Sequence, residues 1–140
     1  LADTVHGRLD GERQVHLVLE NDRNQAGLLA RGTAPDRPRW YTAQWNDDVH
    51  HAFHVLLTGE RTGDYADYAA EPAAHLGRAL TRGFAYQGES SPFRGGVARG
   101  EPSGHLPPTA FVGFLQNHDQ VGNRALGDRL AALRPAAVAS

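Results

Sequence analysis

The sequence predicts an α/β fold with parallel strands, and two observations carry this prediction. Three short apolar runs alternate with segments of helical spacing, and we find no hairpin turn between any two runs. Such alternation is typical of parallel strands joined by right-handed crossovers. Each run also ends in acidic or amide residues, as strands do at the active face of a (β/α)₈ barrel. A whole barrel takes about 250 residues, so we expect a fragment of one.

The first two expected strands lie in the first third of the chain. Residues 15–19, VHLVL, form a β-type run that ends at Glu20. Residues 40–45, WYTAQW, form a second run that ends in the polar cluster 46–48. Both runs therefore carry candidate site residues at their carboxyl ends.

The third expected strand is the apolar run 110–115, AFVGFL, which we predict to be buried on both faces. An unbroken polar cluster follows it and consists of Gln116, Asn117, His118, Asp119 and Gln120. A polar turn without function is the simpler interpretation, but a turn needs fewer such residues. Parallel strands share one carboxyl edge, so the three polar clusters should converge there.

Helices are expected after the second and third strands. Apolar spacing predicts a helix at 49–57, with Asp47 or Asp48 as its N-cap. A further helix is expected at 72–82, because proline suits a first helical turn. A last helix is expected at 123–133, where three leucines are in register.

Residues 88–108 form a long segment rich in glycine, proline and serine. Ordinary connections have about 4–6 residues, so this one is expected to be either functional or disordered. Aromatic residues that could stack on sugar rings lie in or near the expected loops, namely Trp40, Tyr41, Trp45, Tyr65, Tyr68, Tyr86 and Phe93.

The composition argues against several classes of function. The net charge is −2, which gives no electrostatic signature of nucleic-acid or membrane binding. There is no apolar run of membrane-spanning length and no signal-peptide pattern. Cysteine is absent, which excludes thiolate chemistry within these residues and is compatible with the cytoplasm. We therefore expect a cytoplasmic protein that binds neither nucleic acid nor membrane.

Two carboxyl groups could cleave a glycosidic bond. Glu20 follows four apolar residues, and partial desolvation at a strand mouth favours a protonated carboxyl that can act as an acid. Asp119, beside His118 and amides, is expected to stay ionised. A protonated and an ionised carboxyl that face each other suit glycoside hydrolysis. From spacing alone, Glu20 could equally be a solvated strand end, and Trp45 could be ordinary core.

A second constellation competes with the carboxyl pair. Asp47, His50, His51 and His54 lie within eight residues, and His50 and His54 have the i, i+4 spacing of zinc ligands. The zinc-protease motif needs a glutamate directly after its first histidine, and His51 stands there instead. A metal-dependent hydrolase therefore stays open as an alternative, although capping, packing or sugar binding explains these histidines more simply.

Four blocks resemble the α-amylase superfamily of glycoside hydrolases, and within it the trehalohydrolase group. FLQNHDQVGNR at 114–124 is similar to the superfamily's block after the seventh barrel strand, and HLVLEND at 16–22 to the block after the fifth. QWNDDVHHAFHVLLTGE at 44–60 and YQGESSPFRG at 86–95 are similar to segments of the trehalohydrolase group in particular. The resemblance covers about residues 1–134.

The resemblance implies a role for each matching residue. Glu20 would be the general acid/base, Asp119 the carboxylate that stabilises the transition state, and His118 a ligand of sugar hydroxyls. The other implied substrate-binding residues are Trp45, Asp47, Asp48, Asn117 and Gln120. The implied reaction is retaining hydrolysis, without metal or cofactor, of the α-1,4 bond that joins a terminal trehalose to a malto-oligosaccharide.

One feature of the family is missing from its expected place. The family's nucleophile is an Asp in an Arg-x-Asp block at the fourth strand, and the Arg-x-Asp at 8–10 lies just before the fifth. We therefore expect the nucleophile before Leu1, and we interpret residues 1–140 as strands five to seven of a catalytic domain truncated at both ends. Its partners would be the rest of that domain and the substrate, and the fragment alone should be inactive.

Three other functions remain open at this point. A glycogen branching enzyme or an α-amylase would share the same superfamily blocks. A metal-dependent hydrolase would use the histidine cluster. A carbohydrate-binding remnant would keep the cleft without the chemistry.

Overall fold

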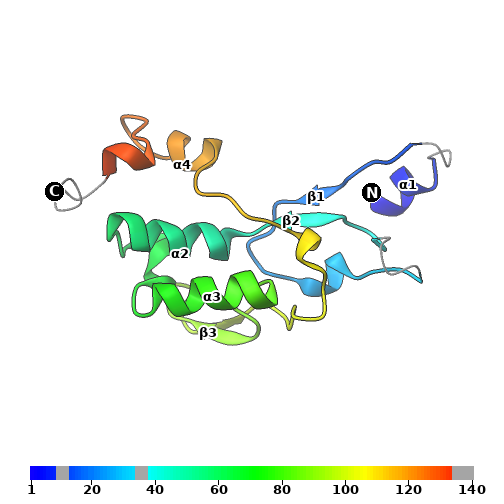
Figure 1. The fold of residues 1–140 in the computed structure, drawn as a ribbon, viewed down its shortest axis with the longest axis horizontal. Coiled ribbons are helices and arrows are strands. Elements are labelled where there is room, and N and C mark those ends of the chain that lie inside the picture. The colour runs from blue at the N-terminus through cyan, green and yellow to red at the C-terminus, as the bar shows by residue number, and fades with distance from the viewer. Residues whose placement is uncertain (9–12, 34–37, 134–140) are drawn as a thin grey trace.

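The structure is a computed structural model that describes residues 1–8, 13–33 and 38–133 (Figure 1). The Arg-x-Asp triplet at 8–10 lies mostly outside the described residues. The helices are α1 (Ala2–His6), α2 (Asp47–Thr58), α3 (Pro72–Arg82) and α4 (His118–Gly122); the strands are β1 (Val18–Leu19), β2 (Ala43–Trp45), β3 (Glu89–Ser91), β4 (Val97–Arg99) and β5 (Phe111–Val112).

The three predicted strands form one parallel sheet in the order β1-β2-β5. Val18 pairs with Ala43, and Gln44 pairs with Phe111, so β2 lies between its two neighbours. The parallel arrangement confirms the prediction from alternation. Each strand is shorter than its apolar run, and β5 is half-buried rather than buried on both faces, because β2 is its sole strand partner within the described residues.

The structure also has a hairpin that was not predicted, although no hairpin joins the three predicted strands. β3 and β4 pair antiparallel within the long segment 88–108, which is therefore ordered. The turn between them closes with a hydrogen bond from Gly96 N to Ser91 O of 2.9 Å. Gly95 and Gly96 both have positive φ, a conformation that glycine adopts at no steric cost.

Helix α2 begins two residues earlier than predicted, and its N-cap is Asn46 rather than Asp47 or Asp48. The Asn46 side-chain oxygen accepts from Val49 N at 3.4 Å. The two aspartates fall in the first turn, where negative charge is favourable to the helix dipole. Helix α3 has the predicted bounds, with Pro72 in its first turn as expected.

The helix predicted at 123–133 is not formed as such. α4 starts earlier, at His118, because Asn117 and Gln120 form a capping box there. The chain then turns at Gly127, which has a φ of 65°, before a 3₁₀ turn over Leu130–Leu133. Local capping and a glycine turn therefore override the leucine spacing.

Two apolar clusters hold these elements together. One joins α2, α3 and the segment after α3, and the other joins the segment after β1 to the approach to β5. The Phe111 ring packs closely against Gly83 at the end of α3: the φ of Gly83 is 91°, and a Cβ atom there would lie 2.3 Å from this ring. Among the described residues, no helix has the length and apolar character needed to cross a membrane.

Candidate active site

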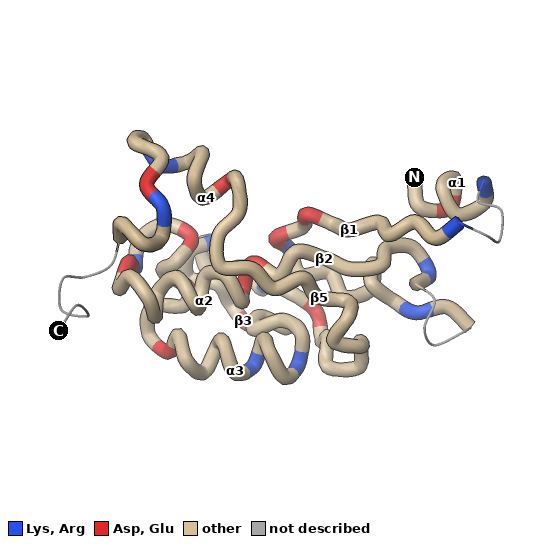
Figure 2. The backbone as a smooth tube through the Cα atoms, turned by 45° about the horizontal axis from the view of Figure 1, so that its top comes forward, with Lys and Arg blue, Asp and Glu red and all other residues tan. Residues whose placement is uncertain are grey.

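The carboxyl ends of β1, β2 and β5 surround one cavity of about 520 Å³. Its walls come from the segment after β1, the start of α2, the β3–β4 turn and the start of α4. Acidic positions lie just beyond β1 and at α4 (Figure 2). The polar clusters that follow the three strands are thus neighbours in space.

Seven of the eight predicted site residues line this cavity; they are Glu20, Trp45, Asp47, Asn117, His118, Asp119 and Gln120. Glu20 and Asp119 come from the two outer strands of the sheet, so they approach the cavity from opposite sides of β2. The Glu20 side chain is exposed, so the partial desolvation expected at the strand mouth is not met. Its carboxyl makes no hydrogen bond or ion pair with any described residue.

A carboxyl with a raised pKa does lie in the cavity, and it is Asp47. Burial raises the pKa of Asp47 to about 6; nearby Arg99 opposes this effect, and the adjacent Asp48 carboxylate adds to it. Asp47 can therefore change its protonation state near pH 6 beside the candidate catalytic groups.

Asp48 does not line the cavity, contrary to the expectation that it contacts substrate. Its side chain is fully buried and forms an ion pair with Arg99, with Oδ1 3.1 Å from Nη2. It also accepts hydrogen bonds from the Asn24 side chain, the Tyr68 hydroxyl and two backbone N–H groups. The reason is helical geometry, because consecutive residues point about 100° apart.

Asn117 and Gln120 line the cavity while capping α4. Asn117 Oδ1 accepts from Asp119 N at 2.9 Å, and Gln120 Oε1 accepts from Asn117 N at 2.8 Å. These bonds fix the backbone that carries His118 and Asp119, whose side chains lie 3.4 Å apart at Nε2 and Oδ1. The predicted polar cluster is thus both a helix start and a cavity wall.

The segment from β5 to α4 rests on side chains of β2, α2 and the residues just after α2. The Phe114 ring lies edge-on to Trp45, with 5.2 Å between centroids, and is stacked on His50 at 5.0 Å. His50 Nδ1 lies 2.6 Å from Leu115 O. Burial lowers the pKa of His50 to about 4, so the ring is neutral at pH 7, and Nδ1 donates to this carbonyl.

His50 and His54 of the histidine cluster make structural contacts, whereas His51 lines the cavity. His54 Nε2 lies 2.7 Å from the Glu60 carboxylate, which also pairs with Arg124. Burial lowers the pKa of His51 to about 3. No group of three or more possible ligands is arranged for a metal ion within the part of the chain that the structure describes. The geometry therefore does not favour a metal centre on α2.

The β3–β4 hairpin is a part of the cavity wall that strand prediction missed. Asp67 accepts from Ser91 Oγ at 2.5 Å and from Phe93 N at 2.9 Å, which holds the turn against the cavity. Arg94 in the turn pairs with Asp22 after β1 at 2.6 Å. The glycine-rich composition of the segment was the available signal, but it did not reveal the pairing.

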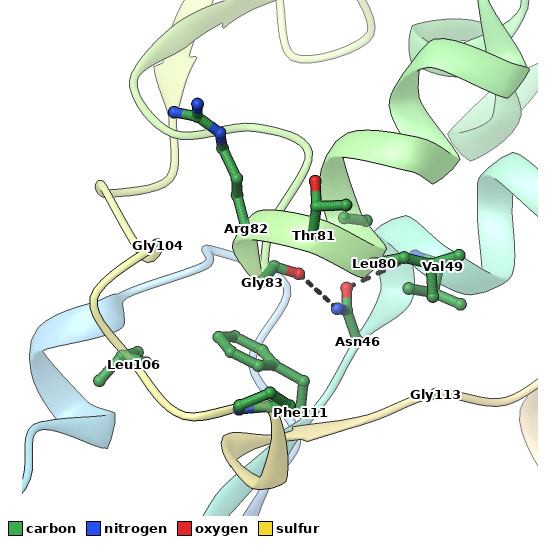
Figure 3. A pocket seen from close by; sticks show the side chains of 12 residues that line it. Asn46, Val49, Leu80, Thr81, Arg82, Gly83, Gly104, Leu106, Phe111 and Gly113 are labelled. Carbon is green, nitrogen blue, oxygen red and sulfur yellow. Dashed lines mark hydrogen bonds between the residues drawn. The ribbon is translucent and has the colours of Figure 1, made fainter.

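A second cavity, of about 200 Å³, lies away from these groups (Figure 3). It is mainly apolar and lies between the end of α3 and Phe111, where Asn46 donates to Gly83 O at 2.6 Å. Among the residues that the structure describes, Arg82 is the one charged residue in its lining, and no carboxyl lines it. It offers no acid/base pair, so the larger cavity is the candidate active site.

Comparison with known proteins places this geometry in a class. A crystal structure from Salmonella typhimurium, provisionally named an alpha amylase, matches 96% of the chain with a TM-score of 0.90 and 49% identity, and the match covers 23% of that structure. No family model matches the chain. The class is that of α-amylase-like (β/α)₈-barrel proteins, and the chain has the fold of one part of such a barrel.

The curated relatives narrow the class. Malto-oligosyltrehalose trehalohydrolases match at 42% identity over 119 residues in Mycobacterium tuberculosis, 41% over 139 in Rhizobium sp. (strain M-11) and 46% over 131 in Deinococcus radiodurans. These matches cover 84%, 96% and 93% of this chain. The chain is therefore related to the malto-oligosyltrehalose trehalohydrolases of the α-amylase family of glycoside hydrolases. It spans about a fifth of their length, between 20% and 22%.

Proposed function

We propose that the full-length protein carrying this chain is a retaining α-glycosidase that releases trehalose from malto-oligosaccharides ending in trehalose. In this proposal the chain supplies strands five to seven of the catalytic barrel as β1, β2 and β5. The rest of the barrel supplies the nucleophile. The fold neighbour and the identity to trehalohydrolases support the assignment.

One observation carries the proposal. Glu20 and Asp119 lie 99 positions apart in the sequence, after strands β1 and β5 that are not neighbours in the sheet, and yet both line one cavity. Two carboxyl groups that flank a cleft are what glycoside hydrolysis requires. Asp47, whose pKa burial raises to about 6, adds a third carboxyl to the same wall.

The chemistry assigns one step to each group. The Glu20 carboxyl donates its proton to the glycosidic oxygen as the bond to the departing trehalose breaks, while the nucleophile forms a bond to the anomeric carbon. The Glu20 carboxylate then takes a proton from the water that attacks this carbon and frees the nucleophile. Asp119 carries the negative charge that stabilises the oxocarbenium-like transition state.

The remaining cavity residues bind sugar in this scheme. Trp45 offers an aromatic surface to a glucose ring, and His118 lies at the rim beside Asp119, where it can bond hydroxyl groups. Asn117 and Gln120 have their side-chain oxygens engaged in the α4 cap, so their amide N–H groups are what they can offer to substrate. Asp47 completes this polar wall.

The test is an assay of free trehalose released from malto-oligosyltrehalose by the full-length protein. Glu20→Gln should lower the rate by about 10²–10⁴-fold, since it removes acid catalysis. The matched control is Glu71→Gln, because Glu71 is an exposed carboxyl at the start of α3 whose side chain does not cap the helix. Full activity of the Glu20 variant would overturn the role of Glu20.

The same assay separates the related functions. A branching enzyme or α-amylase would act on α-glucan without releasing trehalose. Activity that survives a strong chelator would argue against metal-dependent hydrolysis, which the α2 histidines do not favour. We also propose a cytoplasmic location, supported by the absence of cysteine from the 140 residues.

A further inference from the structure

We propose that the buried Asp48–Arg99 pair positions the candidate acid Glu20, acting through Asn24 and the backbone of the loop after β1. The inference rests on the proposed function, since it concerns how the acid of that reaction is held. Asp48 and Arg99 are positioning residues here, because both are buried and neither lines the cavity.

Glu20 needs support of this kind. Its carboxyl has no hydrogen bond or ion pair among the described residues, and its side chain is exposed. No side-chain contact therefore fixes its place at the cavity. The backbone of residues 20–24 fixes it instead.

Three side-chain hydrogen bonds hold this loop from the protein interior, beside a backbone bond from Glu101 N to Asn24 O of 3.0 Å. Gln44 Nε2 donates to Asn21 O at 2.7 Å, and Arg99 Nε donates to Asp22 O at 2.9 Å. Asn24 Nδ2 donates to Asp48 Oδ2 at 2.9 Å. Two of the three lead directly to the buried ion pair.

Asn24 is the residue where the loop enters the interior. It is fully buried, and it is the one described non-glycine residue with positive φ, 55°. Asparagine tolerates this conformation better than most residues do. The hydrogen bond to Asp48 offsets the free-energy cost of this positive φ. The conformation of the loop and the ion pair therefore depend on each other.

Several further partners hold the Asp48–Arg99 pair rigidly in place. Asp48 Oδ2 accepts from Ala85 N at 2.6 Å and Tyr86 N at 3.1 Å as well as from Asn24. Oδ1 accepts from the Tyr68 hydroxyl at 2.5 Å and faces Arg99. Both oxygens of the Asp48 carboxylate thus have partners, and a buried polar group satisfied in this way favours a single geometry. The Asn24 side-chain oxygen, in contrast, has no hydrogen-bond partner among the described residues, so Nδ2 alone links this side chain to the pair. Through Asn24, this geometry also fixes the loop of residues 20–24, which carries Glu20.

Position matters because a general acid must lie within hydrogen-bond reach of the oxygen it protonates. A displacement of about 1 Å can cost about 10²-fold in rate. Loss of the Asn24 link should therefore impair proton donation and leave the other steps in place.

The experiment compares two variants of the full-length enzyme on two substrates. Asn24→Gly keeps the positive φ accessible and removes the link toward Glu20. Tyr68→Phe removes the hydroxyl that donates to Asp48 Oδ1, on the opposite side of the same carboxylate, and accepts from Arg99 Nη1, while the Asn24 and Asp22 links remain. The substrates are malto-oligosyltrehalose, whose leaving group needs a proton, and α-maltotriosyl fluoride, whose fluoride leaves without one.

Asn24→Gly should lose about 10-fold or more in kcat/KM on malto-oligosyltrehalose and about 2-fold or less on the fluoride. Tyr68→Phe should change both substrates by the same factor. Equal losses on both substrates in Asn24→Gly, or no loss on either, would overturn the inference. If Asn24→Gly fails to unfold cooperatively, Arg99→Lys replaces it, since it keeps the charge and loses the Nε bond to Asp22.

Glu20→Gln, run in parallel, distinguishes this inference from the proposed function. A Glu20→Gln variant without the same substrate dependence would show that Glu20 is not the acid, and the proposed function would fail. A Glu20→Gln variant that has the dependence, beside an Asn24→Gly variant that lacks it, would defeat the positioning role alone.

Discussion

Two arginine–carboxylate pairs hold the two sides of the candidate active site, and they differ in burial. Asp48 and Arg99, below the loop that carries Glu20, have side chains 0% and 4% exposed. Arg124, at the end of the segment that carries Asp119, pairs with Glu60, which follows α2. The side chains of Glu60 and Arg124 are 31% and 26% exposed. One side of the cavity is thus built from the interior, and the other rests on the surface of α2.

The difference concerns how firmly each catalytic carboxyl is held. The Glu20 loop is tied to buried polar atoms that have several partners each. The Asp119 segment is held by ring contacts of Phe114, the His50–Leu115 bond and a partly exposed ion pair. Regions with fewer buried contacts open at lower free energy, so the Asp119 side should be the more mobile wall.

The largest effect is expected from Arg99→Ala. This change leaves the Asp48 carboxylate buried without its counter-ion, which typically costs about 3–5 kcal/mol. Urea unfolding of the full-length protein would measure the loss. Arg78→Ala is the control, because Arg78 pairs with Glu89 where both are exposed. A loss no larger than that of the control would mean that the buried pair is not the stronger support.

An intermediate effect that depends on pH is expected from Asp47→Asn. The pKa of Asp47 in the folded protein is raised to about 6 from 3.8, so the folded state favours the protonated form. The stability that this group contributes is therefore present below about pH 4 and is lost as the pH rises through 6. The variant escapes this loss and should gain up to about 2 kcal/mol over wild type at pH 7 relative to pH 4.

Unfolding free energies of wild type and Asp47→Asn, compared between pH 4 and pH 7, check this prediction. A difference that stays constant with pH would show that Asp47 is solvated in the intact cleft. It would also remove Asp47 as a titrating group of the active site.

The smallest effect is expected from Arg124→Ala. The hydrogen bond from Arg124 lowers the pKa of Glu60, but the pair is partly exposed, and such pairs contribute about 0–1 kcal/mol. Unfolding should change little, whereas amide hydrogen exchange should quicken in residues 117–124. Exchange that quickens equally after β1 would contradict the contrast between the two walls.

Sequence reasoning predicted the residues of this site that follow the ends of strands. Glu20 and Asp119 each follow an apolar run, and parallel strands bring such positions together without any knowledge of side-chain contacts. The burial of Asp48 was beyond reach, because its partners Asn24, Tyr68 and Arg99 are distant in sequence.

Local signals also competed in ways that the sequence did not resolve. Leucine spacing at 123–133 predicted a helix, but the capping box at Asn117 started one earlier. The β3–β4 hairpin was missed because its strands have three residues each and little apolar character, and the contacts of Asp67 hold its turn.

The neighbouring aspartates at the start of α2 set a limit on length variation. Asp47 enters the cavity and Asp48 enters the interior because the helix rotates by about 100° per residue. One residue inserted between β2 and α2 would move Asp48 to the place of Val49 in the apolar cluster, and one residue deleted would put Val49 beside Arg99 in place of Asp48. Engineering by segment exchange should therefore keep the β2–α2 junction intact and place its joints elsewhere.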